Sequence, residues 1–353
     1  MEKIDILSLS YDELLEEILK LGEKKFRAGQ IYSWLHEKNA KSFDEITCLS
    51  KDFRNTLAER FYIPSVETVR ILKSKIDKTQ KFLYKLEDGN YVETVSMNYH
   101  HGISLCISTQ VGCKMGCRFC ASAIAGFVRD LKPSEMLLQI YESERNIGEK
   151  IDSIVLMGIG EPLDNYDNVM KFFDILSSPE GRNMSLRHVT MSTCGIVPKI
   201  NELAEKKLGI TLSVSLHSSD NEHRDAIMPV NKAYNINKLI NACRDYVKKT
   251  GRRVTFEYAV IEHVNSSKED AKKLAELLKG MNCHVNLIPV NKVKERNYYT
   301  VHRTVETFRK NLEYFGVNAT VRRTLGADIE AACGQLRRDA IEKQKAENMS
   351  ISE

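Results

Sequence analysis

Three cysteines lie close together between Cys113 and Cys120, with the spacing C-x3-C-x2-C. Cysteine thiolates are the usual ligands of iron–sulfur clusters, and three of them on one short loop can hold three irons of a 4Fe-4S cube. We therefore predict Cys113, Cys117 and Cys120 as the ligands, with the fourth iron left open to a small molecule. Zinc is the main alternative, but a structural zinc site usually has four nitrogen or sulfur ligands, and no second cysteine pair follows this loop.

Polar side chains follow several of the later apolar runs. The polar groups at these positions are Glu161, Ser192, Ser215, His217 and Asn291. Because the carboxyl ends of parallel strands meet at one rim, these groups would come together and could hold a nucleoside with an amino-acid tail. Taken singly, each is equally compatible with a strand-end turn or, for His217, with an ordinary buried histidine.

The hydrophobic pattern changes near residue 95. Apolar residues recur at helical spacing from Tyr11 to about Arg60, and residues 68–97 alternate apolar and polar side chains around the turn Asp88-Gly89-Asn90. This pattern predicts a small helical module followed by short hairpin strands.

Beyond this point, apolar runs alternate with amphipathic segments of helical period. The expected strands are 104–111, 152–157, 187–192, 210–216, 253–261, 284–290 and 317–322, and the expected helices are 133–147, 165–177, 235–249, 266–280 and 301–315. The alternation is typical of α/β proteins with a mainly parallel sheet. About six such units are too few for an eight-fold barrel. We therefore expect a partial (β/α)6 barrel over 96–336, an accessory module over 1–95 and a polar tail over 337–353.

The composition is that of an ordinary soluble protein. The chain has 353 residues, of which 42% are hydrophobic and 28% charged, and its net charge is +4. The first residues do not form a signal peptide, and no apolar run reaches the roughly 18 residues of a membrane helix. Nine cysteines in such a chain indicate metal-binding, catalytic or buried thiols more than a disulfide framework. These features predict a cytoplasmic protein without membrane contact.

Six motifs, in this order and spacing, resemble the RlmN family of radical S-adenosylmethionine (SAM) enzymes. They are Leu105–Cys113, Met157–Leu163, Ser215–His217, Met228–Asn231, Val285–Pro289 and Asp328–Leu336. The resemblance implies a radical SAM barrel that methylates C2 of an adenine in 23S ribosomal RNA, and of an adenine beside the anticodon in tRNA.

The resemblance also implies a role for each site residue. Cys113, Cys117 and Cys120 would hold the cluster, and the SAM contacts would be Gly160, Glu161, Ser192, Ser215, Leu216, His217 and Asn291. Two SAM molecules would be used per turnover, one of them to methylate Cys333, the methyl carrier. Glu93 would accept a proton, and a transient Cys106–Cys333 disulfide would release the product. The implied partners are the two RNAs and an electron donor such as flavodoxin or ferredoxin, and the implied enzyme is a monomer.

Several alternatives stay open at this stage. A Cfr-type relative methylates C8 of the same ribosomal adenine, although Val111, Pro162 and Pro289 resemble the C2 branch. A non-enzymatic iron–sulfur RNA-binding protein would bind RNA without cleaving SAM, and another radical SAM enzyme would act on a small molecule or peptide. The candidate phosphate contacts are Lys24, Lys25, Arg27, Arg252, Arg253, Arg322 and Arg323. Each could equally be an ordinary exposed charge, and the first three a solvated turn between helices.

Overall fold

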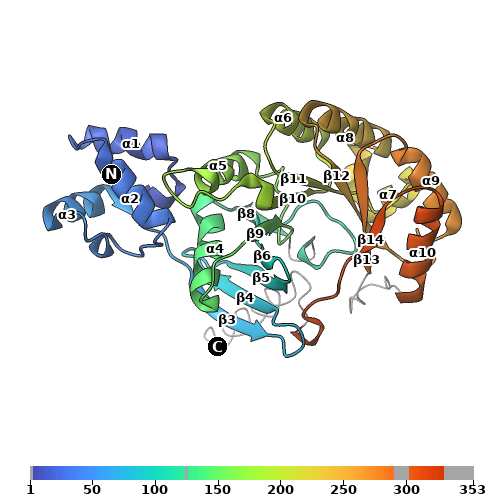
Figure 1. Ribbon diagram of the computed structural model, residues 1–353, viewed down its shortest axis with the longest axis horizontal. Helices are drawn as coiled ribbons and strands as arrows, with labels where there is room; N and C mark the ends of the chain where they lie inside the picture. Colours follow the sequence, from blue (N-terminus) through green and yellow to red (C-terminus); the bar gives the residue numbers. More distant parts are fainter. Residues whose placement is uncertain (1–2, 124–125, 290–301, 330–353) are drawn as a thin grey trace, which may run out of the picture.

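The computed structural model describes residues 3–123, 126–289 and 302–329. The predicted site residues Asn291 and Cys333, and the predicted tail over 337–353, lie outside these ranges. Within the described part, a small N-terminal helical module lies beside a large sheet that carries helices along its outer side (Figure 1).

The N-terminal module is helical, as the spacing of its apolar residues predicted. Its elements are α1 (Tyr11–Lys20), α2 (Phe26–His36), α3 (Lys51–Arg60), the 3-10 turns η1 (Ile6–Ser8) and η2 (Phe43–Glu45), and the parallel pair β1 (Ile4–Asp5) and β2 (Phe61–Tyr62). Helix α1 begins at a capping box, in which the Ser10 hydroxyl accepts from the Glu13 N–H and the Glu13 carboxylate accepts from the Ser10 N–H. One turn apart on its inner face, Leu14 and Ile18 are buried, so an amphipathic pattern fixes the helix on the core.

The main sheet runs in the order β14-β13-β12-β11-β10-β9-β6-β5-β4-β3. Its parallel strands are β6 (Gly102–Cys106), β9 (Ser153–Leu156), β10 (Val189–Thr193), β11 (Thr211–Ser215), β12 (Val254–Val260), β13 (Cys283–Pro289) and β14 (Ala319–Val321). Its antiparallel strands are β5 (Tyr91–Tyr99), β4 (Gln80–Lys85) and β3 (Glu67–Lys73). Because β14 and β3 form its two edges, the sheet is open, as predicted.

Six helices connect neighbouring parallel strands within the described residues. They are α4 (Pro133–Ile147), α5 (Tyr166–Ser177), α6 (Val197–Lys206), α8 (Ile236–Thr250), α9 (Lys268–Leu278) and α10 (His302–Tyr314). Short elements fill the connections: β7 (Gln110–Gly112), β8 (Phe127–Asp130), α7 (Asn221–Ile227), and the 3-10 turns η3 (Ala121–Ala123), η4 (Leu186–His188), η5 (Pro229–Lys232) and η6 (Ala327–Ile329). The prediction of six βα units is confirmed.

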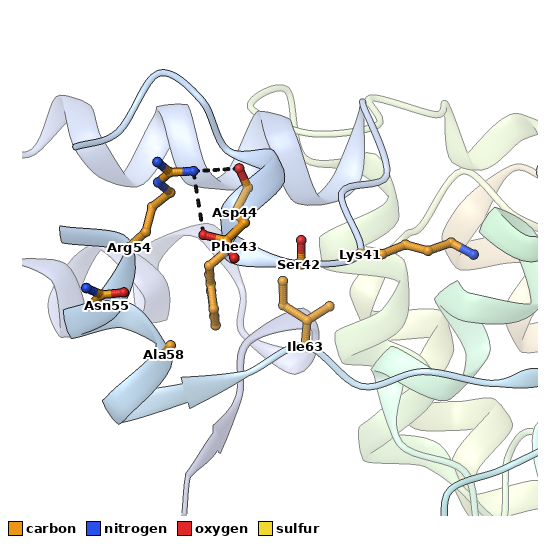
Figure 2. Close-up of a pocket in the computed structure, with 8 residues that line it drawn as sticks. All are labelled: Lys41, Ser42, Phe43, Asp44, Arg54, Asn55, Ala58 and Ile63. Atoms are coloured by element: carbon orange, nitrogen blue, oxygen red, sulfur yellow. Dashed lines mark hydrogen bonds and ion pairs between the residues drawn. The ribbon is translucent and has the colours of Figure 1, made fainter. Parts of the chain in front are cut away.

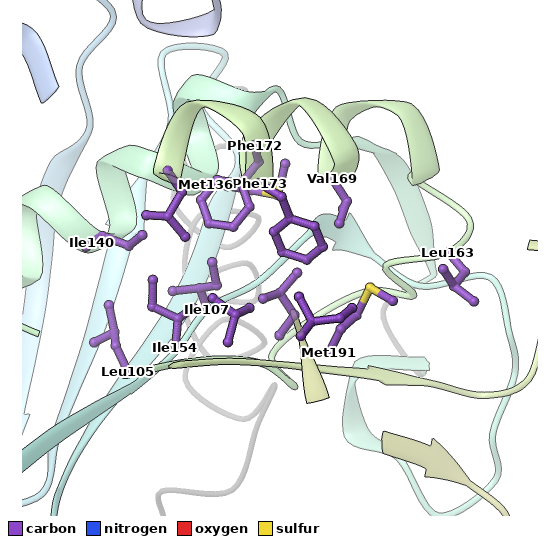
Figure 3. Close-up of a cluster of buried hydrophobic side chains, with 14 of the residues drawn as sticks. Leu105, Ile107, Met136, Ile140, Ile154, Leu163, Val169, Phe172, Phe173 and Met191 are labelled. Atoms are coloured by element: carbon purple, nitrogen blue, oxygen red, sulfur yellow. The ribbon is translucent and has the colours of Figure 1, made fainter. Parts of the chain in front are cut away.

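The core between the sheet and α5 is apolar and closely packed (Figure 3). Leu105, Ile154 and Met191, from three neighbouring strands, lie below Phe172 and Phe173, and all five are at most 1% exposed. Burying each of these side chains contributes roughly 1.5–3 kcal/mol. This layer holds the strands in register and so fixes where their carboxyl ends lie.

The predicted strand over 104–111 is wrong in its middle. Strand β6 ends at Cys106, and β7 pairs with β8 in a separate small sheet. The Ile107 N–H still bonds to the sheet at the Val155 carbonyl, but the Thr109 N–H bonds to Ile159, beyond the end of β9. Residues 107–111 are all buried, so the chain stays in the interior after it has left the ladder.

Residue 95, the predicted boundary between two domains, lies within β5. This strand pairs with β6, so β3, β4 and β5 continue the sheet of the barrel. The division of the chain into an accessory module and a barrel remains a prediction.

Candidate active site

The predicted cluster ligands lie on the loop between β7 and η3. Cys113, Cys117 and Cys120 are each partly buried. The Cys113 N–H donates to the Gly126 carbonyl (3.2 Å), and the Cys120 N–H donates to the Cys117 carbonyl (3.2 Å). Both ends of this cysteine loop, residues 113–120, are therefore held by backbone hydrogen bonds.

The cysteine loop packs against the segments that follow β10, β11 and β12. The Arg118 N–H donates to the Ile227 carbonyl (2.9 Å), and Cys117 packs against the small apolar cluster that includes Ile227. The Phe119 ring lies edge-on to the His217 ring, with 4.7 Å between centroids. The structure thus brings the predicted ligands to the rim where the predicted SAM contacts lie.

The thiols of the loop interact electrostatically. Burial, and after it repulsion from Cys120, raises the pKa of the Cys113 thiol to about 12. Burial is also the first cause that raises the pKa of Cys117, followed by repulsion from Cys120 and Cys113. Bound iron would offset both effects, because metal charge favours the thiolate.

The donor set fits an iron–sulfur cube. In the described residues, no three His, Cys, Asp or Glu side chains are grouped so that they could hold a metal ion together. In a cube each thiolate binds a different iron, so three thiolates need not converge on one point and the fourth iron stays open. Cys113, Cys117 and Cys120 are the residues that would hold it.

Two glycines after β9 allow a close approach of the backbone. Gly160 has φ +115°, and a Cβ placed there would lie 2.7 Å from the Gln110 nitrogen. A Cβ on Gly158 would lie 2.6 Å from the Ile107 carbonyl oxygen. Any larger residue would push the β9 end away from the segment that leads into the cysteine loop.

Glu161 follows these glycines and is only 4% exposed. Its two carboxylate oxygens accept from the Leu163 N–H (3.0 Å) and the Cys194 N–H (2.7 Å). Burial raises the pKa of this carboxyl, while the hydrogen bond from Cys194 lowers it. Each carboxylate oxygen has further lone-pair capacity, so Glu161 could still accept from a ligand's ammonium group.

Three further predicted SAM contacts lie at the ends of β10 and β11. Ser192 and Ser215 are partly buried, and Leu216 is fully buried. The Leu216 N–H donates to the Glu257 carbonyl (3.0 Å), and its own carbonyl accepts from Arg224 Nε (3.0 Å). The two strands are neighbours in register, so these residues share one edge of the sheet.

His217 is buried and adopts φ +56°. Its Nδ1 accepts from the Ala259 N–H (2.8 Å), and its carbonyl accepts from Asn265 Nδ2 (2.7 Å). Burial, assisted by the charge of Arg224, lowers the pKa of His217 to about 3. The imidazole is therefore neutral, with its proton on Nε2.

Glu93, the predicted proton acceptor, forms a buried ion pair between β5 and β4. Its Oε2 lies 3.0 Å from Lys81 Nζ, and the two side chains are 2% and 1% exposed. The Glu93 carbonyl accepts from Ser108 Oγ (2.8 Å), which links β5 to the segment before the cysteine loop. An ionised carboxylate is an acceptor only, which is the form that general-base chemistry requires.

Cys106 lies beside β5, at the end of β6. It is 4% exposed and forms a small apolar cluster with Val95 and Met97. Leu325, from the segment that leads toward Cys333, packs against this cluster. Cys333 itself and the predicted SAM contact Asn291 lie outside the described residues.

The segment that contains Leu325 is anchored to the loop between β3 and β4, residues 74–79. Asp328 accepts from Ser74 Oγ (2.6 Å) and from the Lys75 N–H (2.8 Å). In the opposite direction, the Gly326 N–H donates to Asp77 Oδ2 (2.7 Å). We call this set of hydrogen bonds the hairpin anchor.

A pocket of about 280 Å³ lies in the N-terminal module (Figure 2). Its lining residues are Lys41, Ser42, Phe43, Asp44, Arg54, Asn55, Ala58 and Ile63. Arg54 Nη1 donates to the Asp44 carbonyl (2.6 Å) and lies 3.6 Å from the Asp44 carboxylate. None of the predicted cluster or SAM residues lines this pocket.

Three of the basic residues expected to contact RNA lie between α1 and the first turn of α2. Lys24 and Lys25 are exposed. Arg27 is partly engaged within the module, because its Nη1 donates to Gln30 (2.9 Å) and its Nε lies 3.9 Å from the Glu23 carboxylate. Their contact with RNA remains a prediction.

Two family models match this sequence. The radical SAM superfamily matches residues 107–278, and the ribosomal RNA large subunit methyltransferase N-terminal domain matches residues 4–63. A protein of Lachnospira eligens described as a probable dual-specificity RNA methyltransferase RlmN is 55% identical over 339 residues, which cover 96% of this chain and 97% of the relative. A protein of Lachnoclostridium phytofermentans with the same description is 50% identical over 99% of both chains.

The chain belongs to the RlmN family.

A solved structure supports the fold of this RlmN family member. The crystal structure of a radical SAM methyltransferase from Sphaerobacter thermophilus aligns with a TM-score of 0.90 and 40% identity, covering 94% of this chain and 98% of the other. The predictions of the family, of the partial barrel and of a radical SAM enzyme are confirmed. Enzymes of this class use a 4Fe-4S cluster and SAM. Across the described residues, no helix has the length and apolarity needed to cross a membrane.

Sequence reasoning missed three side chains that organise the site of this RlmN family member. Lys81, Arg224 and Asn265 are all buried. A signal existed for Lys81, because the period of two places it on the same face of β4 as the buried Leu83. Arg224 lies on the seven-residue helix α7 and Asn265 lies after β12, where no periodic pattern shows the direction of a side chain.

Proposed function

We propose that this RlmN family member methylates C2 of an adenine in 23S ribosomal RNA and of an adenine beside the anticodon in tRNA. The observation that carries the proposal is the packing of Leu325 against the cluster containing Cys106. This contact supports a route by which the segment bearing Cys333 reaches the end of β6. Together with the buried Glu93 on the adjacent strand, it supports a site with two thiols and one carboxylate.

The proposed chemistry follows from the target atom. Adenine C2 lies between two ring nitrogens and is electron-poor, so it cannot attack a methyl cation equivalent as an amine would. When bound, the cluster and two SAM molecules per turnover supply the methyl group and the one-electron chemistry that such a carbon needs. Gly160, Glu161, Ser192, Ser215, Leu216, His217 and Asn291 would hold SAM. The neutral His217 ring and the Glu161 carboxylate would orient it at the rim.

Three residues of the chain carry the remaining steps. Cys333 holds the transferred carbon as a thioether, first as its S-methyl group and then as a bridge to C2. Glu93 would accept the proton that C2 loses, and the electron lost with it would pass to the bound cluster. The Cys106 thiolate then attacks the Cys333 sulfur, so that an S–S bond forms, the C–S bond breaks, and its electron pair passes to the bridging carbon. That carbon takes up a proton and becomes the methyl group of the product.

The proposal also covers the partners of the enzyme. Residues 1–95 would form an accessory module that binds RNA, with the exposed Lys24 and Lys25 near phosphates. Residues 96–336 would form the catalytic barrel, followed by a tail over 337–353. The target adenine must leave its stack, at a cost of a few kcal/mol, and the module would hold the RNA meanwhile. We further propose a cytoplasmic monomer that receives electrons from a flavodoxin or ferredoxin.

The test is mass spectrometry of RNA after reaction. Anaerobically reconstituted protein is incubated with a reductant, methyl-labelled SAM and fragments of both RNAs. We expect label on C2 of adenine in both fragments, and no label with Cys333→Ala. Label on C8 would indicate the Cfr-type reaction instead. RNA binding with no SAM cleavage would indicate a non-enzymatic iron–sulfur RNA-binding protein.

A further inference from the structure

Arg224 is a fully buried guanidinium on α7, and its hydrogen-bond partners among the described residues are all neutral. Its Nη2 donates to the carbonyls of Cys194 (2.8 Å) and Ser215 (3.0 Å). Its Nε donates to the Leu216 carbonyl (3.0 Å), and its Nη1 to Asn231 Oδ1 (2.9 Å). The backbone at the ends of β10 and β11, where predicted SAM contacts lie, thus holds the guanidinium in place. Among the described residues, no carboxylate forms a hydrogen bond with it.

Arg182 gives a comparison within the same chain. Its side chain is 7% exposed, and it bonds to both oxygens of the Glu144 carboxylate, at 3.0 and 2.6 Å. This is the usual arrangement, because burying a charge is costly unless an opposite charge accompanies it. Near Arg224, the Asp225 carboxylate is partly exposed and accepts from Asn231 Nδ2 (2.8 Å). Arg224 is therefore a buried positive charge whose hydrogen-bond partners are neutral polar groups.

The cysteine loop lies against the same short helix. The Arg118 N–H donates to the carbonyl of Ile227, the last residue of α7 (2.9 Å), and Cys117 packs with that residue. Cys194, whose carbonyl accepts from Arg224, belongs to the same small apolar cluster as Ile227 and Cys117. The residues that hold Arg224 thus pack directly against one of the three proposed cluster ligands.

We propose that Arg224 is the counter-charge of the iron–sulfur cluster, placed behind the cysteine loop to offset the negative charge of the cluster and its thiolates. This inference rests on the proposed function, because it requires Cys113, Cys117 and Cys120 to hold a cube. Three thiolates outnumber the positive charges of the oxidised cube, and one-electron reduction adds another negative charge. In a site of low dielectric constant, a fixed cation nearby stabilises the reduced form more than it would in water. Arg224 would thereby raise the reduction potential without touching the substrate.

The test compares the redox equilibrium of the cluster in four proteins: wild type, Arg224→Gln, Arg224→Lys and Arg182→Gln. Each is reconstituted anaerobically, its iron and sulfide are counted, and its cluster is titrated with a reductant while the EPR signal is followed. For Arg224→Gln we expect the equilibrium constant for reduction to fall on the order of tenfold, which corresponds to about 59 mV for a one-electron couple. Arg224→Lys keeps the charge and should stay near the wild-type potential. Arg182→Gln, which removes a buried guanidinium from another site, should leave the potential unchanged.

The outcomes distinguish an effect of the Arg224 charge on the potential from an effect of its hydrogen bonds on the structure. A wild-type potential in folded, loaded Arg224→Gln would overturn the inference. If Arg224→Gln does not fold, Arg224→Lys decides, because a lysine keeps the charge but cannot reproduce the four hydrogen bonds. A loaded Arg224→Lys with a potential near that of the wild type would then support the counter-charge, and loss of its cluster or a large shift would overturn it. If wild-type protein binds no iron and sulfide, the proposed cluster fails, and with it the function on which this inference depends.

Discussion

At the scale of single residues, the ion pair between Lys81 and Glu93 is a clear case of two charged side chains buried together inside the fold. Both side chains are nearly inaccessible, and the charged atoms lie 3.0 Å apart. Lys81→Met should lower the free energy of unfolding by about 3–5 kcal/mol, because one partner of a buried pair is then left with its main counter-charge removed. Denaturant unfolding of the reconstituted protein measures the change.

The double variant Lys81→Met, Glu93→Met is the matched control. It removes both charges and keeps apolar volume in the site, so it should be more stable than Lys81→Met alone. It should nevertheless form no methylated RNA, since the proposed proton acceptor is gone. A double variant no more stable than Lys81→Met would show that the pairing between the two charges contributes nothing measurable.

The Cys106→Ala and Cys333→Ala variants should differ in whether a covalent protein–RNA adduct accumulates. With Cys333→Ala there is no methyl carrier, and neither product nor a protein–RNA adduct should form. With Cys106→Ala the carbon still reaches adenine, but no thiol is present to attack the Cys333 sulfur. A nuclease-sensitive, shifted band should therefore accumulate on a denaturing gel and resist thiol reductants, because its bond is carbon–sulfur. Normal turnover of the Cys106→Ala variant would show that Cys106 is an ordinary core thiol with no role in the reaction.

At the scale of elements, the hairpin anchor holds the segment that precedes Cys333. Asp328→Ala removes two of its hydrogen bonds, to Ser74 and Lys75. We expect faster amide exchange at residues 326–329 and slower methylation of the Cys333 peptide, with little change in the global unfolding transition. Both are measured by mass spectrometry. Glu205→Ala, which removes an exposed ion pair with Lys249 on other helices, should alter neither.

Exchange and methylation rates equal to those of the wild type in Asp328→Ala would contradict a role for the anchor in positioning the carrier. Slower methylation accompanied by a large loss of global stability would point instead to general unfolding of the barrel edge.

The elements themselves were largely predictable from sequence. Apolar runs alternating with amphipathic segments indicated the six βα units, because each of their strands buries apolar side chains and the connecting helices bury an apolar face against the sheet. The strand over 104–111 was misjudged, since residues 107–111 stay buried after the chain has left the ladder. Hydrophobicity reports burial, and it does not report which hydrogen bonds a buried backbone makes.

Within the candidate site, features that depend on local spacing could be predicted from sequence, whereas contacts between residues far apart in the chain could not. The cysteine motif and the glycines near Glu161 could be recognised because each consists of residues close together in sequence. Lys81 and Arg224 were missed because a charged residue in an unknown context is normally a surface residue. Only the folded chain shows that Glu93 lies beside Lys81 and that four acceptors surround Arg224.

At the scale of the whole molecule, the N-terminal module rests on α4 of the barrel. His36 of α2 is fully buried there, with its Nδ1 2.9 Å from the Tyr141 hydroxyl. Beside it, Lys41 Nζ lies 3.1 Å from a carboxylate oxygen of Glu142. The module is thus joined to the barrel through a neutral histidine as well as through charged groups.

This contact should make the protein sensitive to acid. Burial lowers the pKa of His36 from 6.5 to about 3, so below pH 6.5 the unfolded chain binds a proton that the folded chain does not. The contribution of His36 to stability is complete above its unfolded pKa and is lost as the pH falls toward the folded value. Between about pH 7.5 and about pH 5 the loss should be about 2 kcal/mol.

His36→Gln should flatten this dependence by the same amount, because an amide can still bond to Tyr141 but does not titrate. Urea unfolding at several pH values measures the difference between the two proteins. Parallel curves for wild type and variant would remove His36 from the acid response.

The hairpin anchor joins residues that lie 249 to 254 positions apart in the chain. During synthesis on the ribosome, the β3–β4 loop and the cysteine loop emerge long before Gly326 and Asp328. A nascent chain at that stage already contains the proposed cluster ligands, but the thiol that would carry the methyl group has not yet been translated. The order of translation would thus keep a polypeptide that ends before Cys333 from being trapped on RNA through that thiol, because the proposed methyl carrier is made after both loops.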